Sequence, residues 1–254
     1  MRKRILGTAI AAAAIAAAAA GSASAPPAGA AQPPAPAPAP DLGPLNAMTA
    51  ALASTPHKIV MSTPGSSTTG AVDPAHHAAR AVATTAEFEI DEVVSGGMVD
   101  VKANLGTETN GQLGITPTVW MKLDTSKLSP DNALLIQPDG TDLVDLAGIE
   151  NGMTSLHAVD ARHLTGTIDL TQVTGHTVPN PQEVLQAGTP ATRAPFRVTA
   201  DAQGRISEFT VDTSSFDPAL GLDVRYSDYG APEQVVLPGS SAPAPASIYQ
   251  IFGS

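Results

Sequence analysis

Histidines and aspartates form three short groups in this chain, and none has the spacing that a metal or catalytic site requires. His76 and His77 are adjacent, and neighbouring residues of a strand point to opposite faces, so the pair is poorly placed to share one metal ion. His157, Asp160 and His163 are three residues apart, a spacing that would gather them only on a helix, whereas the surrounding sequence is typical of a strand. We interpret these histidines as ordinary surface residues.

The third group, Asp139, Asp142 and Asp145, does not match a calcium loop, which takes acidic residues at its first, third and fifth positions. Carboxylates near the start of a helix are better explained by capping and by the helix dipole. The sequence has no nucleophile elbow, phosphate-binding loop or dinucleotide fingerprint. It has no cysteine, which excludes a thiol nucleophile and a cysteine-based zinc site. We predict a protein that is not an enzyme, with no catalytic residue, metal or cofactor.

Tyr226 and Tyr229, in the string YSDYGAP, are the last candidates for direct recognition. They would suit an aromatic contact patch. The glycine and proline that follow them are typical of a turn, so the tyrosines are better interpreted as a cap on the edge of a sheet.

The N-terminus has the pattern of a secretory signal peptide. Three basic residues at positions 2–4 precede an apolar, alanine-rich run at positions 5–20, which is shorter than the roughly 20 apolar residues of a membrane-spanning helix. We predict a signal peptide over residues 1–25, with cleavage after Ala23 or Ala30 as alternatives. The mature protein is then secreted or held in the cell envelope, outside the cytoplasmic membrane.

Proline-rich stretches set the limits of the folded region. Residues 26–40 are almost only alanine and proline, a composition that forms an extended spacer rather than a core. Residues 238–254 form a second Pro/Ser/Ala stretch with a short apolar end at 248–252. One folded domain is predicted between them, at residues 41–237, large enough to bury a core without disulfides.

The charge balance limits the partners. Removal of the three basic residues of the signal peptide leaves 10 Lys and Arg against 24 Asp and Glu, a net charge of −14. An acidic surface of this kind repels nucleic acid and anionic lipid headgroups. Any contact with lipid is therefore expected at an apolar site.

The order of predicted elements indicates an α+β domain with a large antiparallel sheet. Residues 41–55 form a short amphipathic helix with Leu45, Met48 and Leu52 on one face, and residues 141–153 form a second helical stretch. Alternating or β-branched runs predict strands at residues 57–63, 68–72, 81–90, 98–105, 119–123, 159–170, 196–200, 205–212, 223–226 and 234–237. In the run 119–123, the period of two places Val119, Met121 and Leu123 on an inner side and Trp120 and Lys122 on an outer side.

Several strings, taken in order, resemble the LppX/LprG-type cell-envelope lipoproteins, relatives of the LolA and LolB lipoprotein carriers. The strings are TGAVDP (69–74), VWMKL (119–123) with residues 124–128, HLTGTIDLT (163–171), AQGRI (202–206) and YSDYGAP (226–232). The resemblance covers about residues 43–237. This chain departs from the family in one respect, because members are usually anchored through a lipidated cysteine and this chain has none.

The resemblance implies a curved antiparallel half-barrel with helices on its concave side and an apolar cavity between them. It implies a carrier of lipid or glycolipid, with transient membrane contact and with room for an envelope protein that donates or accepts the lipid. Together with the predicted inner sides of the elements, it gives a candidate lining of nine residues: Leu45, Met48, Leu52, Val119, Met121, Leu123, Leu143, Leu146 and Met153. Met48 and Met153 suit either an adaptable lining or a plain core. The alternative is a protein-interaction or assembly factor in which the half-barrel is packed solid.

Overall fold

The computed structural model describes residues 39–128, 134–136, 143–175, 181–231 and 235–252. The predicted signal peptide and most of the predicted spacer lie outside the described residues. The described chain forms a mixed α+β fold around one large open sheet, which confirms the predicted class at this level. No helix within the described ranges is long and apolar enough to cross a membrane.

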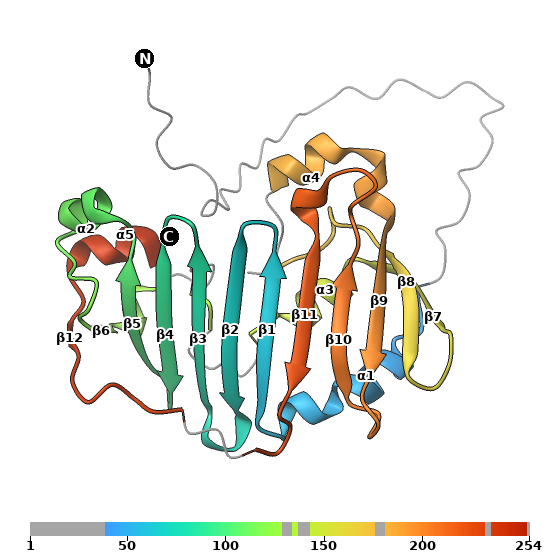
Figure 1. The fold of residues 1–254 in the computed structure, drawn as a ribbon, viewed down its shortest axis with the longest axis horizontal. Coiled ribbons are helices and arrows are strands. Elements are labelled where there is room, and N and C mark those ends of the chain that lie inside the picture. The colour runs from blue at the N-terminus through green and yellow to red at the C-terminus, as the bar shows by residue number, and fades with distance from the viewer. Residues whose placement is uncertain (1–38, 129–133, 137–142, 176–180, 232–234, 253–254) are drawn as a thin grey trace, which may run out of the picture.

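The sheet has twelve strands in the order β12-β6-β5-β4-β3-β2-β1-β11-β10-β9-β8-β7 (Figure 1). The strands are β1 (His57–Thr63), β2 (Ser66–Asp73), β3 (Ala78–Thr85), β4 (Glu89–Ser95), β5 (Met98–Asn104), β6 (Met121–Leu123), β7 (Met153–Ala158), β8 (His163–Ile168), β9 (Ala194–Ala200), β10 (Ile206–Val211), β11 (Leu222–Ser227) and β12 (Ala242–Pro243). The α-helices are α1 (Gly43–Thr49), α2 (Thr107–Leu113), α3 (Leu146–Glu150), α4 (Pro181–Ala187) and α5 (Tyr249–Phe252).

Two antiparallel meanders make up the sheet. We call β1–β6 the N-terminal half and β7–β11 the C-terminal half; they meet where β1 pairs with β11. Strand β12 adds to the outside of β6 in the only parallel pairing among the described strands. Because β12 and β7 stand at opposite ends of the strand order, the sheet is open.

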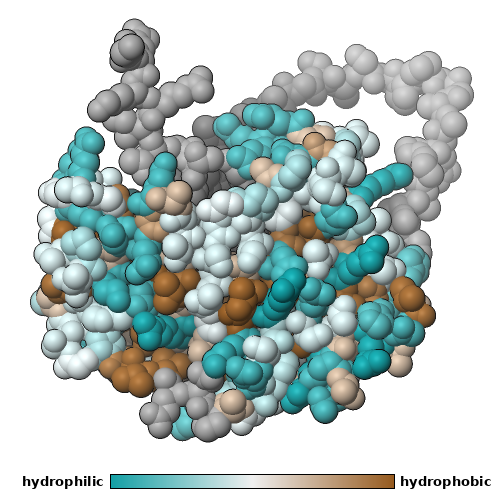
Figure 2. All heavy atoms as spheres, in the orientation of Figure 1, coloured by the Kyte–Doolittle hydropathy of each residue, from teal (hydrophilic) through white to brown (hydrophobic). Residues whose placement is uncertain are grey.

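The two faces of the sheet differ in burial, and we call them inner and outer. Along β9, Ala194, Phe196 and Val198 are buried while Pro195 and Arg197 are exposed, as expected for one face on a core and one in solvent. Figure 2 shows the outer face, where polar residues predominate and apolar ones form separate small patches. The main core cluster therefore lies on the inner face, although a few residues such as Val93 are also buried on the outer side.

The connection from β6 to β7, residues 124–152, must travel between opposite ends of the sheet, and we call it the crossing segment. With strands about 4.8 Å apart, ten strand steps correspond to roughly 48 Å. Its described parts pack on the inner face, and Figure 1 shows α3 behind the strands. Helix α3 begins where Asp145 caps it by accepting a hydrogen bond from Gly148 N, and it ends where Gly152 N donates to Ile149 O.

Several predicted elements are confirmed. The strand at residues 57–63 matches β1, and the predicted hairpin at residues 196–212 corresponds to β9 and β10. The helix at residues 41–55 is α1 followed by a 3-10 turn at Ala50–Ala53. Its apolar residues at spacings of three and four are sufficient to define the buried side.

Other predicted strands are wrong in their limits. The run at 81–90 is two strands, because Thr85 Oγ1 accepts hydrogen bonds from Glu87 N and Phe88 N and so turns the chain between β3 and β4. The run at 119–123 begins as a strand only at Met121, since Val119 N bonds back to Thr116 O in a turn. The run at 159–170 starts with a turn, and β8 begins at His163.

The second helical stretch is shorter than predicted, and a final strand is absent. Within residues 141–153 only α3 is helical, and Met153 already belongs to β7. Of the predicted strand at 234–237, residues 235–237 are described and are not a strand. Sequence patterns also missed α2, α4 and β12.

The C-terminal tail folds against the sheet. Ala242 N donates to Trp120 O at 2.9 Å and Ala244 N donates to Lys122 O at 3.0 Å, which joins β12 to β6. Beyond this strand, Ile248 and Phe252 are buried in the core. The apolar end of the tail is thus part of the structure that closes the β6 end of the sheet.

Candidate functional site

The inner face of the N-terminal half has a floor of small side chains. Gly70 on β2, Ala79, Ala81 and Ala83 on β3 and Ala103 on β5 all point inward, in register with one another or with neighbouring inward residues of β4. These side chains project little above the backbone. The space over this part of the sheet is therefore filled by other parts of the chain.

The crossing segment fills this space. Leu134 and Ile136 have 1% and 0% of their surface exposed and belong to the same core cluster as the floor. Leu143 lies over Gly70, since a Cβ built on that glycine would stand 2.5 Å from Leu143 Cδ1. We call residues 134–136 the strap, because they lie over β4 and are bonded to it.

The strap is held by one buried carboxylate. Glu92 on β4 has no exposed surface, and its two carboxylate oxygens accept hydrogen bonds from Leu135 N at 2.9 Å and Ile136 N at 3.0 Å. Across the sheet its neighbours are Ala81 and Val101. Burial raises the pKa of Glu92 from its ordinary value to about 8, although the two backbone hydrogen bonds act in the opposite direction.

Glu92 was not among the predicted site residues, although the alternation along its strand contains a signal. In β4, Ile90 and Val94 point to the inner face, and the period of two places Glu92 between them on that face. A carboxylate at an inward position of a strand is unusual, because a buried charge is costly unless it finds partners. The inward position of Glu92 therefore predicts a buried carboxylate that needs hydrogen-bond partners from another part of the chain.

The inner face of the C-terminal half is built differently. It is lined by large side chains, and the rings of Phe196 on β9 and Phe209 on β10 stack with centroids 5.7 Å apart. Phe196 lies against Gly166 on β8, where a Cβ would stand 2.6 Å from the ring. In this half, large side chains of the sheet contribute to the core together with residues of α3 such as Leu146 and Ile149.

Eight of the nine predicted lining residues pack into or against the core. Leu45, Met48, Met121, Leu123, Leu143, Leu146 and Met153 are buried, and Leu52 is half-buried against the same cluster. Val119 is the exception: 39% of it is exposed, and it stands before β6 rather than in it. Met121 and Leu123 point inward and Lys122 outward as predicted, and the ring of Trp120 lies 4.9 Å from Lys102 Nζ.

The outer face of the N-terminal half carries a charged cluster. Asp91 accepts hydrogen bonds from Arg80 Nε and Nη2 and from Lys102 Nζ at 2.9–3.0 Å, and this contact raises the pKa of Arg80. Nearby on β5, Asp100 is buried, and its Oδ1 has no hydrogen-bond partner among the described residues. No group of three or more potential metal ligands occurs within the described ranges.

A groove of about 510 Å³ opens over the ends of β1, β11, β10 and β9. Ser62, Asp223, Thr210 and Arg197 contribute to its wall from successive strands, in register on the outer face. Hydrogen bonds from Ser214 and the charge of Arg197 lower the pKa of Asp212, which also lines the groove. This groove is separate from the predicted lining on the inner face.

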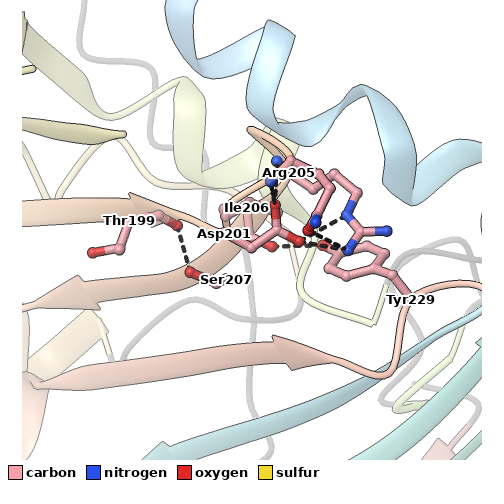
Figure 3. A network of polar contacts seen from close by, with 7 residues as sticks. Thr199, Asp201, Arg205, Ile206, Ser207 and Tyr229 are labelled. Atoms are coloured by element: carbon pink, nitrogen blue, oxygen red, sulfur yellow. Dashed lines mark hydrogen bonds and ion pairs between the residues drawn. The ribbon is translucent and has the colours of Figure 1, made fainter. Parts of the chain in front are cut away.

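The tyrosines of YSDYGAP take part in a structural network at one end of the C-terminal half (Figure 3). Tyr229 donates its hydroxyl hydrogen to Ile206 O at 2.7 Å, and its ring lies 4.5 Å from the guanidinium of Arg205, which pairs with Asp201. Burial and the charge of Asp201 raise the pKa of Tyr229. His57 stacks on the Tyr229 ring at 5.6 Å. The interpretation of both tyrosines as a cap on the edge of a sheet is wrong for Tyr226, which is buried in β11 between β1 and β10.

The candidate metal groups are not assembled into sites. His76 Nδ1 lies 2.6 Å from Asp73, and His77 has a left-handed backbone at the start of β3. His163 Nδ1 lies 2.8 Å from Asp160 in the turn before β8. Asp145 caps α3, whereas Asp139 and Asp142 lie outside the described residues.

Comparison with known proteins adds no assignment. No protein-family model matches the chain, and no curated protein matches it.

Proposed function

We propose that the protein is an exported carrier that binds lipid or glycolipid on the inner face of the sheet and serves the cell envelope. One observation carries the proposal: the N-terminal half has an alanine-rich floor on β3, and apolar residues of the crossing segment pack into the core that contains it. Curvature of the sheet into a half-barrel, with helices on the concave side, is part of this proposal.

An apolar ligand would replace the strap. Leu134 and Ile136 are apolar side chains on an alanine floor, and the alkyl chain of a lipid offers the same chemistry. Two hydrogen bonds join the strap to the sheet through one side chain, the carboxylate of Glu92. In this proposal the ligand binds over the alanine floor, and the strap occupies the same space when no ligand is bound.

The direct test is to purify the mature protein from its natural compartment and analyse an organic extract by mass spectrometry. A stoichiometric lipid supports the proposal. An extract without lipid, together with failure to take up a fluorescent fatty-acid probe, would contradict it.

A variant tests the position of the site. Met121→Arg places a charge on the inner face beside the floor, where an unpaired charge is costly unless it reaches water. We expect the variant to fold and to lose probe uptake. Thr84→Arg, which adds the same charge on the exposed outer side of β3, is the matched control and should keep uptake. Unchanged uptake by a folded Met121→Arg variant would contradict the assignment.

A second candidate is a protein-interaction or assembly factor with a filled interior. The observation in its favour is that eight of the nine predicted lining residues pack into or against one core cluster. Under this hypothesis, Met121→Arg unfolds the protein and the parent takes up no probe. The same melt and uptake experiment therefore separates the two functions.

A further inference from the structure

Glu92 places a carboxyl group in the apolar space that the proposed function assigns to the ligand. It points inward from the middle of β4 and has no exposed surface. Its partners across the sheet, Ala81 on β3 and Val101 on β5, are apolar. The neighbouring inward side chains of these two strands are apolar as well: Ala79, Ala83, Val99 and Ala103. Among the described residues, the strap therefore supplies the only hydrogen-bond donors that reach this carboxyl group.

Displacement of the strap would leave this carboxyl group without partners. An ionised carboxylate only accepts hydrogen bonds, and Glu92 would lose both of its donors, Leu135 N at 2.9 Å and Ile136 N at 3.0 Å. A buried acceptor without a donor is costly. Protonation does not remove the requirement, because the neutral group then has one hydroxyl donor and one carbonyl acceptor to satisfy. A ligand that takes the place of the strap must therefore bring polar atoms to Glu92.

The surroundings of Glu92 restrict the chemistry of those polar atoms. A second anionic group would meet a like charge, and no basic side chain stands at the described inward positions of β3, β4 or β5 to balance it. An ammonium group has three donors directed apart from one another, and this site offers one carboxyl group to accept them. Hydroxyls both donate and accept, so they can pair with Glu92 in either protonation state.

The strap itself shows the arrangement that the ligand has to reproduce. Its two donors belong to consecutive residues, and each reaches a different oxygen of the same carboxylate. Two hydroxyls on neighbouring carbons can bind one carboxylate in the same paired way, and hydrogen bonds to an ionised acceptor are the stronger kind.

We propose that Glu92 is the polar recognition group of the ligand site, and that the ligand is a neutral lipid whose headgroup carries hydroxyls on two neighbouring carbons. The proposal rests on the proposed carrier function and adds the class of ligand to it. The alkyl chain lies over the alanine floor, and the two hydroxyls replace Leu135 N and Ile136 N at the carboxyl group. Glycerol and sugar headgroups share this chemistry, so a monoacylglycerol and an alkyl glycoside are the two sources to compare.

The first experiment compares ligands on the mature parent by titration calorimetry below their critical micelle concentrations. A monoacylglycerol and an alkyl glucoside of the same chain length are each compared with the O-methylated form, which keeps the chain and the oxygens but lacks the donors. We expect at least one of the two hydroxylated lipids to bind about tenfold tighter or more than its methylated form. The lipid with the larger ratio identifies the headgroup as glycerol or sugar.

The outcomes separate this proposal from the proposed function. If both hydroxylated lipids bind only as tightly as their methylated forms, the role of Glu92 is overturned and the carrier function stands. Tighter binding of an alkylamine of the same chain length than of either hydroxylated lipid also overturns it, since Glu92 would then select a cation. If none of these lipids binds, the carrier function and the role of Glu92 fail together.

The second experiment tests whether the preference depends on Glu92. Glu92→Met removes both acceptor oxygens and keeps an unbranched side chain. We expect the preference for the hydroxylated lipid over its methylated form to fall to about one. The methylated form should bind at least as tightly as it binds the parent, because the strap has lost its two hydrogen bonds to the sheet. Glu89→Met, the same substitution at the exposed start of β4, is the matched control and should keep the preference.

A second variant keeps the test decisive if Glu92→Met does not fold. Glu92→Gln retains the shape and one acceptor oxygen but cannot be ionised, and it should reduce the preference by about threefold or more. The full preference of the parent in either folded variant would overturn the assignment of Glu92 as the recognition group.

Discussion

The N-terminal and C-terminal halves of the sheet fill the same kind of space in different ways. In the C-terminal half, Phe196 and Phe209 stack above β9 and β10, so large side chains of the sheet take up much of the space next to it. In the N-terminal half, Ala81 and its neighbours leave room that Leu134 and Ile136 occupy from the crossing segment. A core made from side chains of the sheet is fixed once the strands pair. We propose that the part of the core made by the strap can be exchanged for a ligand without separating a strand pair.

The largest effect is expected from the C-terminal half, at its stacked phenylalanines. Phe209→Ala removes a fully buried ring and its stacking partner contact, and should lower the free energy of unfolding by about 3–5 kcal/mol. We expect no gain in uptake of a fatty-acid probe, since Phe209 belongs to a strand and its removal leaves the strap over β4 in place. Chemical denaturation measures the first quantity and fluorescence titration the second. Increased uptake by this variant would show that both halves accept a ligand.

The second prediction concerns pH and the carboxylate that holds the strap. The pKa of Glu92 is raised to about 8 in the folded protein and is near 4.5 in the unfolded chain, so the folded state binds the proton more tightly. Its contribution to stability is fully present below about pH 4.5 and is lost as pH rises through about 8, by a few kcal/mol in total.

Denaturation at several pH values measures this slope. Glu92→Gln keeps the shape and an acceptor oxygen for the strap but does not titrate, and it should flatten the slope between pH 5 and 8. If the slopes of the two proteins are equal, the pH dependence comes from other groups.

A smaller effect is expected when the strap itself is trimmed. Ile136→Ala should cost about 2–4 kcal/mol, and it should raise probe uptake because the space over the alanine floor is partly vacated. Comparison with Phe209→Ala sharpens the contrast between the halves: both variants lose stability, and only the strap variant gains uptake. A loss of uptake in Ile136→Ala would contradict the proposed exchange of strap and ligand.

The smallest effect is expected at Tyr229, at one end of the C-terminal half. Tyr229→Phe removes the hydroxyl that donates to Ile206 O but keeps the ring between Arg205 and His57. The cost should be about 1 kcal/mol, measured by thermal or chemical unfolding, with no change in probe uptake. A change in probe uptake would mean that the contacts of Tyr229 are energetically coupled to the strap.

The predictable part of the fold rests on patterns that are local. Strand β1 and the β9–β10 hairpin follow from alternation and turn residues, and α1 follows from Leu45 and Met48 at helical spacing. The division of residues 81–90 into two strands depends on one threonine hydroxyl, which propensity does not reveal. Local pattern therefore identifies most elements and misplaces some of their ends.

The candidate site is less predictable because its contacts join distant parts of the chain. Glu92 accepts hydrogen bonds from Leu135 and Ile136, which follow it by 43 and 44 positions in the chain. The sequence around Leu135 and Ile136 has no pattern that predicts this partner. Leu143 was predicted as part of a cavity lining from its helical spacing, whereas its position is set by the glycine beneath it on β2. The inward side of Met121 and Leu123 was predictable because alternation is enough to define a face.

The tail that covers β6 also affects the order in which the fold can be completed. Tyr249 accepts a hydrogen bond from Asp124 N, and Ser247 donates to Leu113 O, contacts that span 125 and 134 positions of the chain. Residues 242–252 are synthesised after every strand of the two meanders, so the β6 end of the sheet stays uncovered while the rest of the domain is already able to pair. During this interval, strands behind β6 are open to incorrect partners. Docking of residues 242–252 is thus the last step of folding. Substitutions that weaken the packing of Ile248 or Phe252 should reduce the yield of folded protein more than they reduce the stability of molecules that have already folded.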